Sequence, residues 1–319
     1  MEMIEKGRAA ENISMFDVVF PSSSSQVFLV DEDDDDLASR ETSGLVDTDV
    51  SVGEESSTNS SKDVDEYMAR REMTPLQERM NAITVIPGAF YCFLLLLSGA
   101  WLDPALVDET MQNDNMATMD DSKCLSSGWL PHLHALPPLP VIAAAFGIVC
   151  HAPFSFIYHW SYAHRLPAGI ARTNHWSRRM DQAMIHFCSA SMAYATSGRL
   201  DFFFANLLFN ADCMYRQFKK QVRPRRNQIR IAISVVAYTI PILRRGDWEL
   251  FGTLWVIFAA SFALFLLYPI GGWSHCAFHL TIALVPPLLM DAAIDLPASQ
   301  EQLQVAAQCA ALAKQAIDS

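Results

Sequence analysis

Long apolar runs fill the last three quarters of the chain and limit what it can fold into. From Ala82 to about residue 295, mostly uncharged segments follow one another, separated by short polar stretches. About 20 apolar residues in an α-helix span the ~30 Å hydrocarbon core of a membrane, because each residue adds ~1.5 Å. The pattern therefore predicts an all-α protein that crosses a membrane several times.

We expect a seven-transmembrane helix bundle within residues 81–296. The predicted helices cover residues 83–102, 139–160, 181–198, 200–216, 228–243, 249–269 and 273–294. The first, second, sixth and seventh are long enough to span the membrane core. The other three are short or polar, and the fourth contains Asn206, Asn210 and Asp212.

The first 80 residues carry the acidic charge of the chain. They contain 20 acidic and 7 basic residues, a net charge of −13, whereas residues 81–319 have a net charge of +1. A segment so rich in Asp, Glu and Ser cannot bury enough apolar surface to fold, so residues 1–80 are predicted to be a disordered acidic tail. We expect a solvated spacer, and a cytosolic protein partner for the tail is the alternative. No nucleic-acid partner is expected, since no domain is basic enough to neutralise phosphates.

Basic residues near the helix ends predict the orientation, because cytosolic loops are enriched in Lys and Arg. They precede the first helix and fill the 2–3 and 4–5 loops, whereas the 1–2 loop has only Lys123 and the 3–4 loop only Arg199. We therefore expect a multi-pass protein with a cytosolic N-terminus. The short C-terminal tail, residues 297–319, would be extracytosolic. Arg244 and Arg245 in the 5–6 loop are an exception to the pattern.

Five polar residues inside the apolar segments are the candidate site. Ser155 and His159 are four residues apart, as are His275 and His279, so each pair shares one helix face. The predicted topology puts both pairs and Asp181 near the cytosolic ends of the second, third and seventh helices. Ionisable residues are expensive at membrane depth and therefore indicate function. Three histidines that leave one tetrahedral position open are typical of a catalytic Zn²⁺ site.

The remaining histidines are predicted to have other roles. His151 lies two turns before His159, and His186 lies about 140° around its helix from Asp181. Core packing is the favoured interpretation of both.

Two of the seven cysteines, Cys124 and Cys309, lie in polar segments on the predicted outer side. They are expected to form a disulfide or to remain two free surface thiols.

Together these motifs resemble the CREST superfamily of seven-helix membrane proteins. The match covers about residues 82–295 through Ser155-x-x-x-His159, Asp181 and His275-x-x-x-His279. The segments Ser274-His-Cys-Ala-Phe-His279 and Arg179-Met-Asp181 look most like the branch of the progestin and adipoQ receptors (PAQR) and hemolysin III. The resemblance implies Zn²⁺ held by His159, His275 and His279, with Asp181 at the metal or its water and Ser155 beside it.

Two functions are compatible with such a site. The first is a Zn²⁺-dependent hydrolase of lipid amides similar to ceramide, whose ligand is a membrane lipid amide or ester. In this case Asp181 would accept a proton from water and Ser155 would donate a hydrogen bond to the substrate carbonyl. The second is a PAQR-like receptor or membrane organiser in which zinc is structural.

Overall fold

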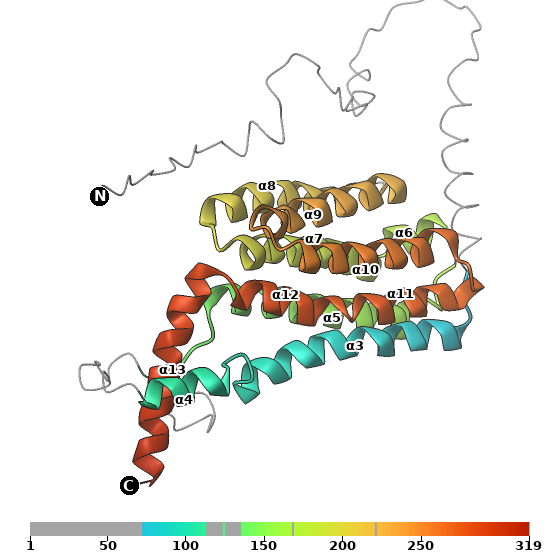
Figure 1. Cartoon of the computed structure of the whole chain (residues 1–319). Helices are drawn as coiled ribbons and strands as arrows, with labels where there is room; N and C mark the ends of the chain where they lie inside the picture. Colours follow the sequence, from blue (N-terminus) through green and yellow to red (C-terminus); the bar gives the residue numbers. More distant parts are fainter. Residues whose placement is uncertain (1–71, 113–123, 125–134, 168, 221, 319) are drawn as a thin grey trace, which may run out of the picture. The chain divides into compact units, whose positions relative to one another are not determined.

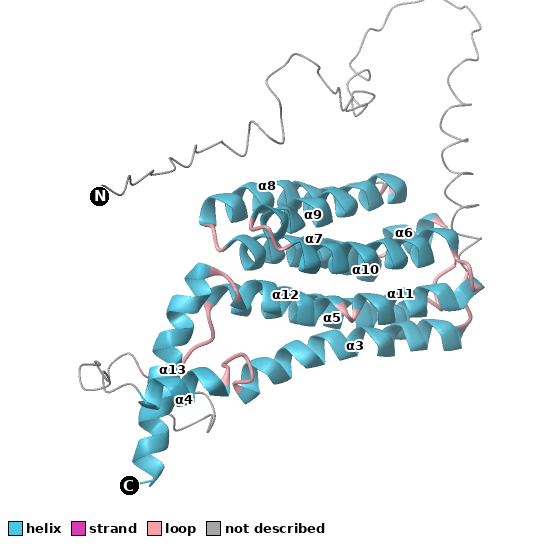
Figure 2. Ribbon diagram, in the orientation of Figure 1, coloured by secondary structure: helices cyan, strands magenta, loops and turns pink. Residues whose placement is uncertain are grey.

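In the computed structural model, residues 72–112, 124, 135–167, 169–220 and 222–318 are described. Helices, short turns and loops form this part of the chain, and it contains no strand (Figure 2). Of the predicted disordered tail, residues 1–71 lie outside the described residues. Residues 75–80 were also predicted to be disordered, but they form the start of a helix.

All seven predicted segments are helical (Figure 1). The α-helices are α3 (Pro75–Ser98), α4 (Pro104–Gln112), α5 (Leu139–Ile157), α6 (Ile170–Asn174), α7 (Trp176–Ser197), α8 (Leu200–Gln217), α9 (Pro224–Arg244), α10 (Trp248–Leu267), α11 (Ser274–Ile282), α12 (Val285–Ile294) and α13 (Pro297–Asp318). A π-helical turn, η4 (Tyr158–Tyr162), continues α5, and a 3₁₀ turn, η5 (Gly271–Trp273), precedes α11.

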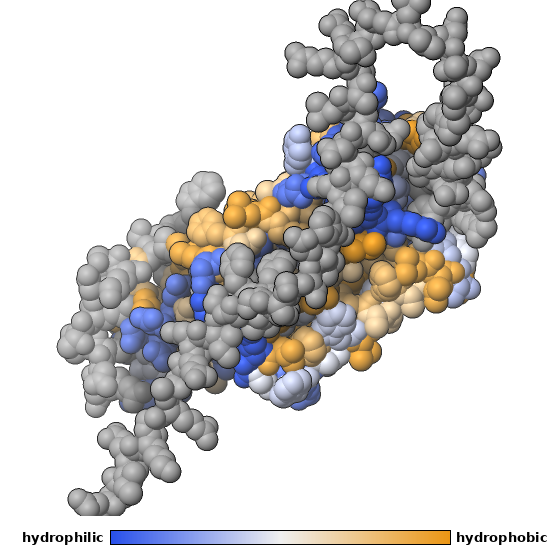
Figure 3. Space-filling view, turned by 90° about the horizontal axis from the view of Figure 1, so that it is seen from above, coloured by the Kyte–Doolittle hydropathy of each residue, from blue (hydrophilic) through white to orange (hydrophobic). Residues whose placement is uncertain are grey.

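Four helical segments of the described chain are long and apolar enough to cross a membrane: α3, α5 with η4, α10, and η5 through α12. Large apolar side chains are exposed on their surfaces, including Phe93 on α3, Phe146 on α5 and Val256 on α10. Figure 3 shows exposed apolar residues (orange) beside hydrophilic ones (blue) on one face of the molecule. This apolar exterior is compatible with a membrane protein.

The other three of the seven predicted helices, α7, α8 and α9, bury polar residues against one another. His186 of α7 lies with its ring nitrogens 3.1 Å from Oδ1 of Asn210 and 3.0 Å from Oδ1 of Asn227. Asn227 donates to Oε1 of Gln182 at 2.8 Å, and the Ser234 hydroxyl donates to Asn210 at the same distance. These hydrogen bonds explain why helices of low hydropathy can pack together, since buried polar groups need partners.

Helix α7 also packs closely on α5, and this contact positions the site. A Cβ atom on Gly147 of α5 would lie 2.9 Å from Cβ of Ser191 and 3.2 Å from Cε of Met192. Glycine therefore permits the approach of the two helices at this point. His151 and Ser155 follow one and two turns later, and they face α7 where it carries Asp181.

Several helix boundaries differ from those predicted; α7 and α9, for example, begin at Trp176 and Pro224, before the predicted residues 181 and 228. Helix α3 begins at Pro75, earlier than the predicted residue 83, because Thr74 and Gln77 form a capping box and Pro75 occupies the first helical position. The seventh predicted helix is divided into α11 and α12 at Ala283 and Leu284, just before Pro286 and Pro287. Proline cannot donate the hydrogen bond that would continue the helix.

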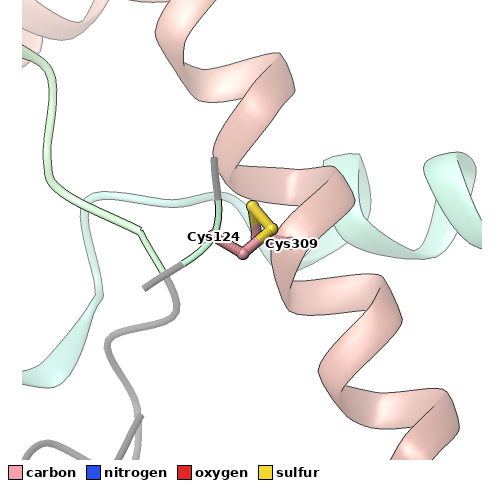
Figure 4. Close-up of a disulfide and its surroundings, with 2 residues drawn as sticks. All are labelled: Cys124 and Cys309. Atoms are coloured by element: carbon pink, nitrogen blue, oxygen red, sulfur yellow. A yellow bond between two sulfur atoms is a disulfide. The ribbon is translucent and has the colours of Figure 1, made fainter. Parts of the chain in front are cut away.

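The C-terminal segment, predicted to be a short tail, is the helix α13. It packs against α4, and Cys309 on α13 forms a disulfide with Cys124 (Figure 4). Of the two alternatives expected for these cysteines, the structure has the disulfide. Helices α4 and α13 lie at the end of the bundle where α3 and α12 end, opposite to the end where α3, α7 and α11 begin (Figure 1).

Candidate metal centre

The first turns of α11 present two histidines from one helix face. His275 and His279 lie one turn apart, and their Nε2 atoms are 3.1 Å from each other. Tetrahedral Zn–N bonds of about 2.0–2.1 Å place two ligand nitrogens roughly 3.3 Å apart. The spacing of this pair therefore fits two ligands of one metal ion.

The third histidine comes from the π-helical turn that ends α5. His159 is 4% exposed, and its ring centroid lies 5.1 Å from that of His275 and 5.4 Å from that of His279. One nitrogen of each of the three rings lies within 4.8 Å of the others, so the group could hold a metal ion. Single π turns are frequent at functional sites because they reorient a side chain relative to the preceding helix.

Glu78, in the first turn of α3, orients His159. Its Oε2 accepts a hydrogen bond of 2.7 Å from Nδ1 of His159, and both side chains are buried. With Nδ1 occupied, Nε2 of His159 is the nitrogen available to a metal. Histidine ligands commonly donate their second ring N–H to a carboxylate, which fixes the tautomer and raises the basicity of the ligand. Asn81, one turn later on α3, donates to the same carboxylate oxygen at 3.3 Å.

Asp181 lies on α7, beside the three histidines but outside the group that could ligate one ion. Its Oδ1 is 3.3 Å from Nε2 of His151, and Ser155 hydrogen-bonds the same carboxylate. Asp181 and Ser155 are both buried. The structure thus places Asp181 between two side chains of α5, where its position is well defined.

A cavity of about 70 Å³ opens onto this end of the bundle. His159, His275, Glu78 and Asp181 line it on one side, and the polar residues around them come from α6, α7, α8 and α9. A small polar molecule in this cavity can therefore approach His159, His275 and Asp181 together.

All five predicted site residues meet at one end of the bundle, and two further residues join them. Core packing is the predicted role of His151, but its Nε2 lies 3.3 Å from Asp181. The pattern His151-x-x-x-Ser155-x-x-x-His159 places the three residues on one helix face and is the sequence signal for this position. Glu78 was counted with the acidic tail, and no spacing in the sequence connects it with His159. His186, in contrast, lies in the network of α7, α8 and α9, as its predicted packing role requires.

The chain was compared with known proteins. No protein-family model and no curated protein matches it. The geometry of the described residues therefore carries the functional argument.

Proposed function

We propose that this protein is a zinc-dependent hydrolase of lipid amides, built as a seven-helix membrane bundle related to the CREST superfamily and closest to its PAQR and hemolysin III branch. One observation carries the proposal. One nitrogen of each of three imidazoles lies within 4.8 Å of the others. Glu78 accepts a hydrogen bond from one of these rings, His159, and Asp181 lies beside the group. Structural and catalytic zinc sites both use histidine nitrogens, but three protein ligands with an adjacent carboxylate favour catalysis.

The membrane arrangement is part of the same proposal. Helices α7, α8 and α9 would be the three additional spans, because their polar side chains bond to one another and need not face lipid. The basic residues of the α8–α9 connection and of the start of α7 lie at the end that holds the histidines. We place this end on the cytosolic side.

The residues present fit Zn²⁺, which favours nitrogen ligands in tetrahedral geometry. When bound, Zn²⁺ would polarise a substrate carbonyl and make water more acidic.

Residues of the chain would then accept and transfer the proton of the attacking water. Asp181 accepts the proton of the attacking water as the water oxygen bonds to the carbonyl carbon. Ser155 and His151 hold the Asp181 carboxylate in place. The proton passes to the leaving nitrogen as the C–N bond breaks, so that a fatty acid and an amine are released. The Ser155 hydroxyl has one hydrogen, and the structure directs it to Asp181. We therefore propose that Ser155 orients the base, which replaces its predicted donation to the substrate carbonyl.

The test is fatty-acid release from ceramides and N-acyl amines by the purified protein, with zinc measured on the same samples. Release that requires zinc and Asp181 is the expected result. A zinc-loaded protein that releases no fatty acid from any lipid amide or ester would contradict the hydrolase proposal.

A structural zinc site, as in a receptor or membrane organiser, is the second candidate. The observation in its favour is that the histidines belong to two separate helical segments, η4 and α11, so a metal would tie these segments together. If zinc is only structural, Asp181→Asn should change neither zinc content nor any measured function.

A further inference from the structure

The arginines of the cavity distinguish it from a neutral lipid pocket. Arg172, Arg178 and Arg179 line the same cavity as His159, His275 and Asp181. Arg178 and Arg179 lie in the first turn of α7, and Arg178 is three residues before Asp181 on the same helix face. At ~1.5 Å per residue, Arg178 lies about 4.5 Å from Asp181 along the helix axis, towards the start of α7.

The cavity carboxylates face imidazoles, and each of the three arginines donates a hydrogen bond to a neutral oxygen. Glu78 pairs with His159 and Asp181 with His151. Arg172 donates twice to the carbonyl oxygen of Leu166, at 3.1 and 2.7 Å, and is almost fully buried. Arg178 donates to the hydroxyl of Tyr158 at 2.8 Å. The neutral carbonyl of Leu166 holds the Arg172 guanidinium in position.

Arg179 is the residue that points most directly to a ligand. One terminal nitrogen donates to Oδ1 of Asn174 at 2.9 Å. Its Nε is buried and finds no hydrogen-bond partner among the residues the structure describes. Gln217 also lines the cavity, and its buried Oε1 likewise has no hydrogen-bond partner among the described residues. A buried donor on a cationic group is costly to leave unpaired, so such a group calls for an explanation.

We propose that this cavity binds an oxyanion carried by a lipid, with Arg179 as the residue that recognises it and Arg178 beside it. Guanidinium groups bind carboxylate and phosphate oxygens strongly through charge-assisted hydrogen bonds. Gln217 accepts a hydrogen bond from an N–H or hydroxyl group of the same ligand. If the proposed hydrolase function holds, on which this step rests, the preferred substrates are lipid amides whose amine portion is anionic, such as N-acyl amino acids.

The experiment uses a matched pair of lipids. N-oleoylglycine and N-oleoylethanolamine have the same acyl chain and amide, but only the first bears a carboxylate. Binding to the full-length protein in phosphatidylcholine nanodiscs is measured by scintillation proximity with tritiated N-oleoylglycine, and empty nanodiscs give the background. Unlabelled N-oleoylethanolamine, oleoyl lysophosphatidate and inorganic phosphate serve as competitors.

Wild-type protein should bind N-oleoylglycine at least ~10-fold more tightly than N-oleoylethanolamine, as expected for a charge-assisted hydrogen bond. Arg179→Gln should abolish this preference. Arg179→Lys should fold normally and retain part of the preference, because it keeps the positive charge. Arg199→Gln is the matched control, because Arg199 is exposed at the other end of α7 and pairs with Asp201. Oleoyl lysophosphatidate should compete, whereas inorganic phosphate should not.

Three results would overturn the proposal. They are equal affinity for the two lipids, an unchanged preference in Arg179→Gln, and displacement by inorganic phosphate with none by the anionic lipids. The histidine variant His275→Ala separates this proposal from the hydrolase function. It should lose fatty-acid release and retain the preference for the anionic lipid. If the wild type and all variants release no fatty acid but the wild type still prefers the anionic lipid, the hydrolase proposal is rejected and the oxyanion proposal stands.

Discussion

Glu78 and His159 are 81 residues apart in the sequence and share a buried hydrogen bond of 2.7 Å. The bond connects the first turn of α3 with the π-helical turn after α5. It selects which ring nitrogen of His159 faces His275 and His279. The position of α3 therefore affects the chemistry of a histidine cluster to which α3 contributes no ligand.

Replacing Glu78 should weaken metal binding without removing a ligand. Glu78→Gln keeps the size of the side chain and loses its charge, so His159 becomes less basic and its tautomer less defined. Loss of such a partner typically costs about 10- to 100-fold in metal affinity. Competition with a zinc chelator, monitored by the zinc retained per chain, measures this change. Glu249→Gln, in the first turn of α10, is the control and should leave affinity unchanged.

Replacing a histidine ligand should reduce zinc binding more than replacing Glu78 does. Purified protein is expected to carry about one Zn²⁺ per chain, and His275→Ala or His279→Ala should remove most of it, because two remaining histidines form a weak site. His164→Ala is the control, since His164 lies outside the three-histidine group. Elemental analysis of the purified variants provides the measurement. Full metal retention in both ligand variants would exclude this site.

Asp181 separates the enzyme from the structural zinc site. Asp181→Asn keeps the shape of the side chain and removes the base, so we expect folded, zinc-loaded protein with hydrolysis reduced by ~10²–10⁴. Ser155→Ala should reduce the rate by about 10- to 100-fold, because a single hydrogen bond to the base is partly replaced by water. Fatty-acid release and zinc content are measured on the same preparations. Unchanged release by Asp181→Asn would remove Asp181 from the mechanism.

The disulfide should stabilise the bundle far from the metal centre. Cys124→Ser or Cys309→Ser is expected to lower the free energy of unfolding by about 2–4 kcal/mol, because the bond closes a long loop in the unfolded chain. Zinc content should stay the same, since the disulfide lies at the opposite end of the bundle. Mass spectrometry after alkylation without reductant checks the bond itself. Free alkylation of both cysteines in the wild type would disprove it.

Asn227 should be essential to the packing of α7, α8 and α9. It donates to Gln182 and accepts hydrogen bonds from Gln217 and the His186 ring. Asn227→Leu leaves these buried groups without a partner, at a cost of about 1–3 kcal/mol for each unsatisfied group. Thermal unfolding in detergent measures the effect. Ile229→Ala is the control on the same helix, because Ile229 is 60% exposed and should change the transition little.

Local sequence patterns predicted the helices and the histidine face. Apolar runs long enough to span a membrane can satisfy their backbone only as helices, so composition and length predict four of the seven segments. The spacing of His275 and His279 fixed their common face, because four residues make about one helical turn. Charge patterns gave a topology that placed His159, Asp181 and His275 at one depth, and the structure brings them to one cavity.

Other features depend on how the helices pack. The sequence did not predict that α5 ends in a π turn, which sets the direction of His159. Glu78 reads as one more acidic residue beside the tail until α3 packs against η4 and buries it. His151 comes within 3.3 Å of Asp181 because α5 packs on α7, and Gly147 permits this close approach. Spacing along one helix can be read from the sequence, whereas hydrogen bonds between helices distant in the chain depend on their packing, which tertiary structure alone decides.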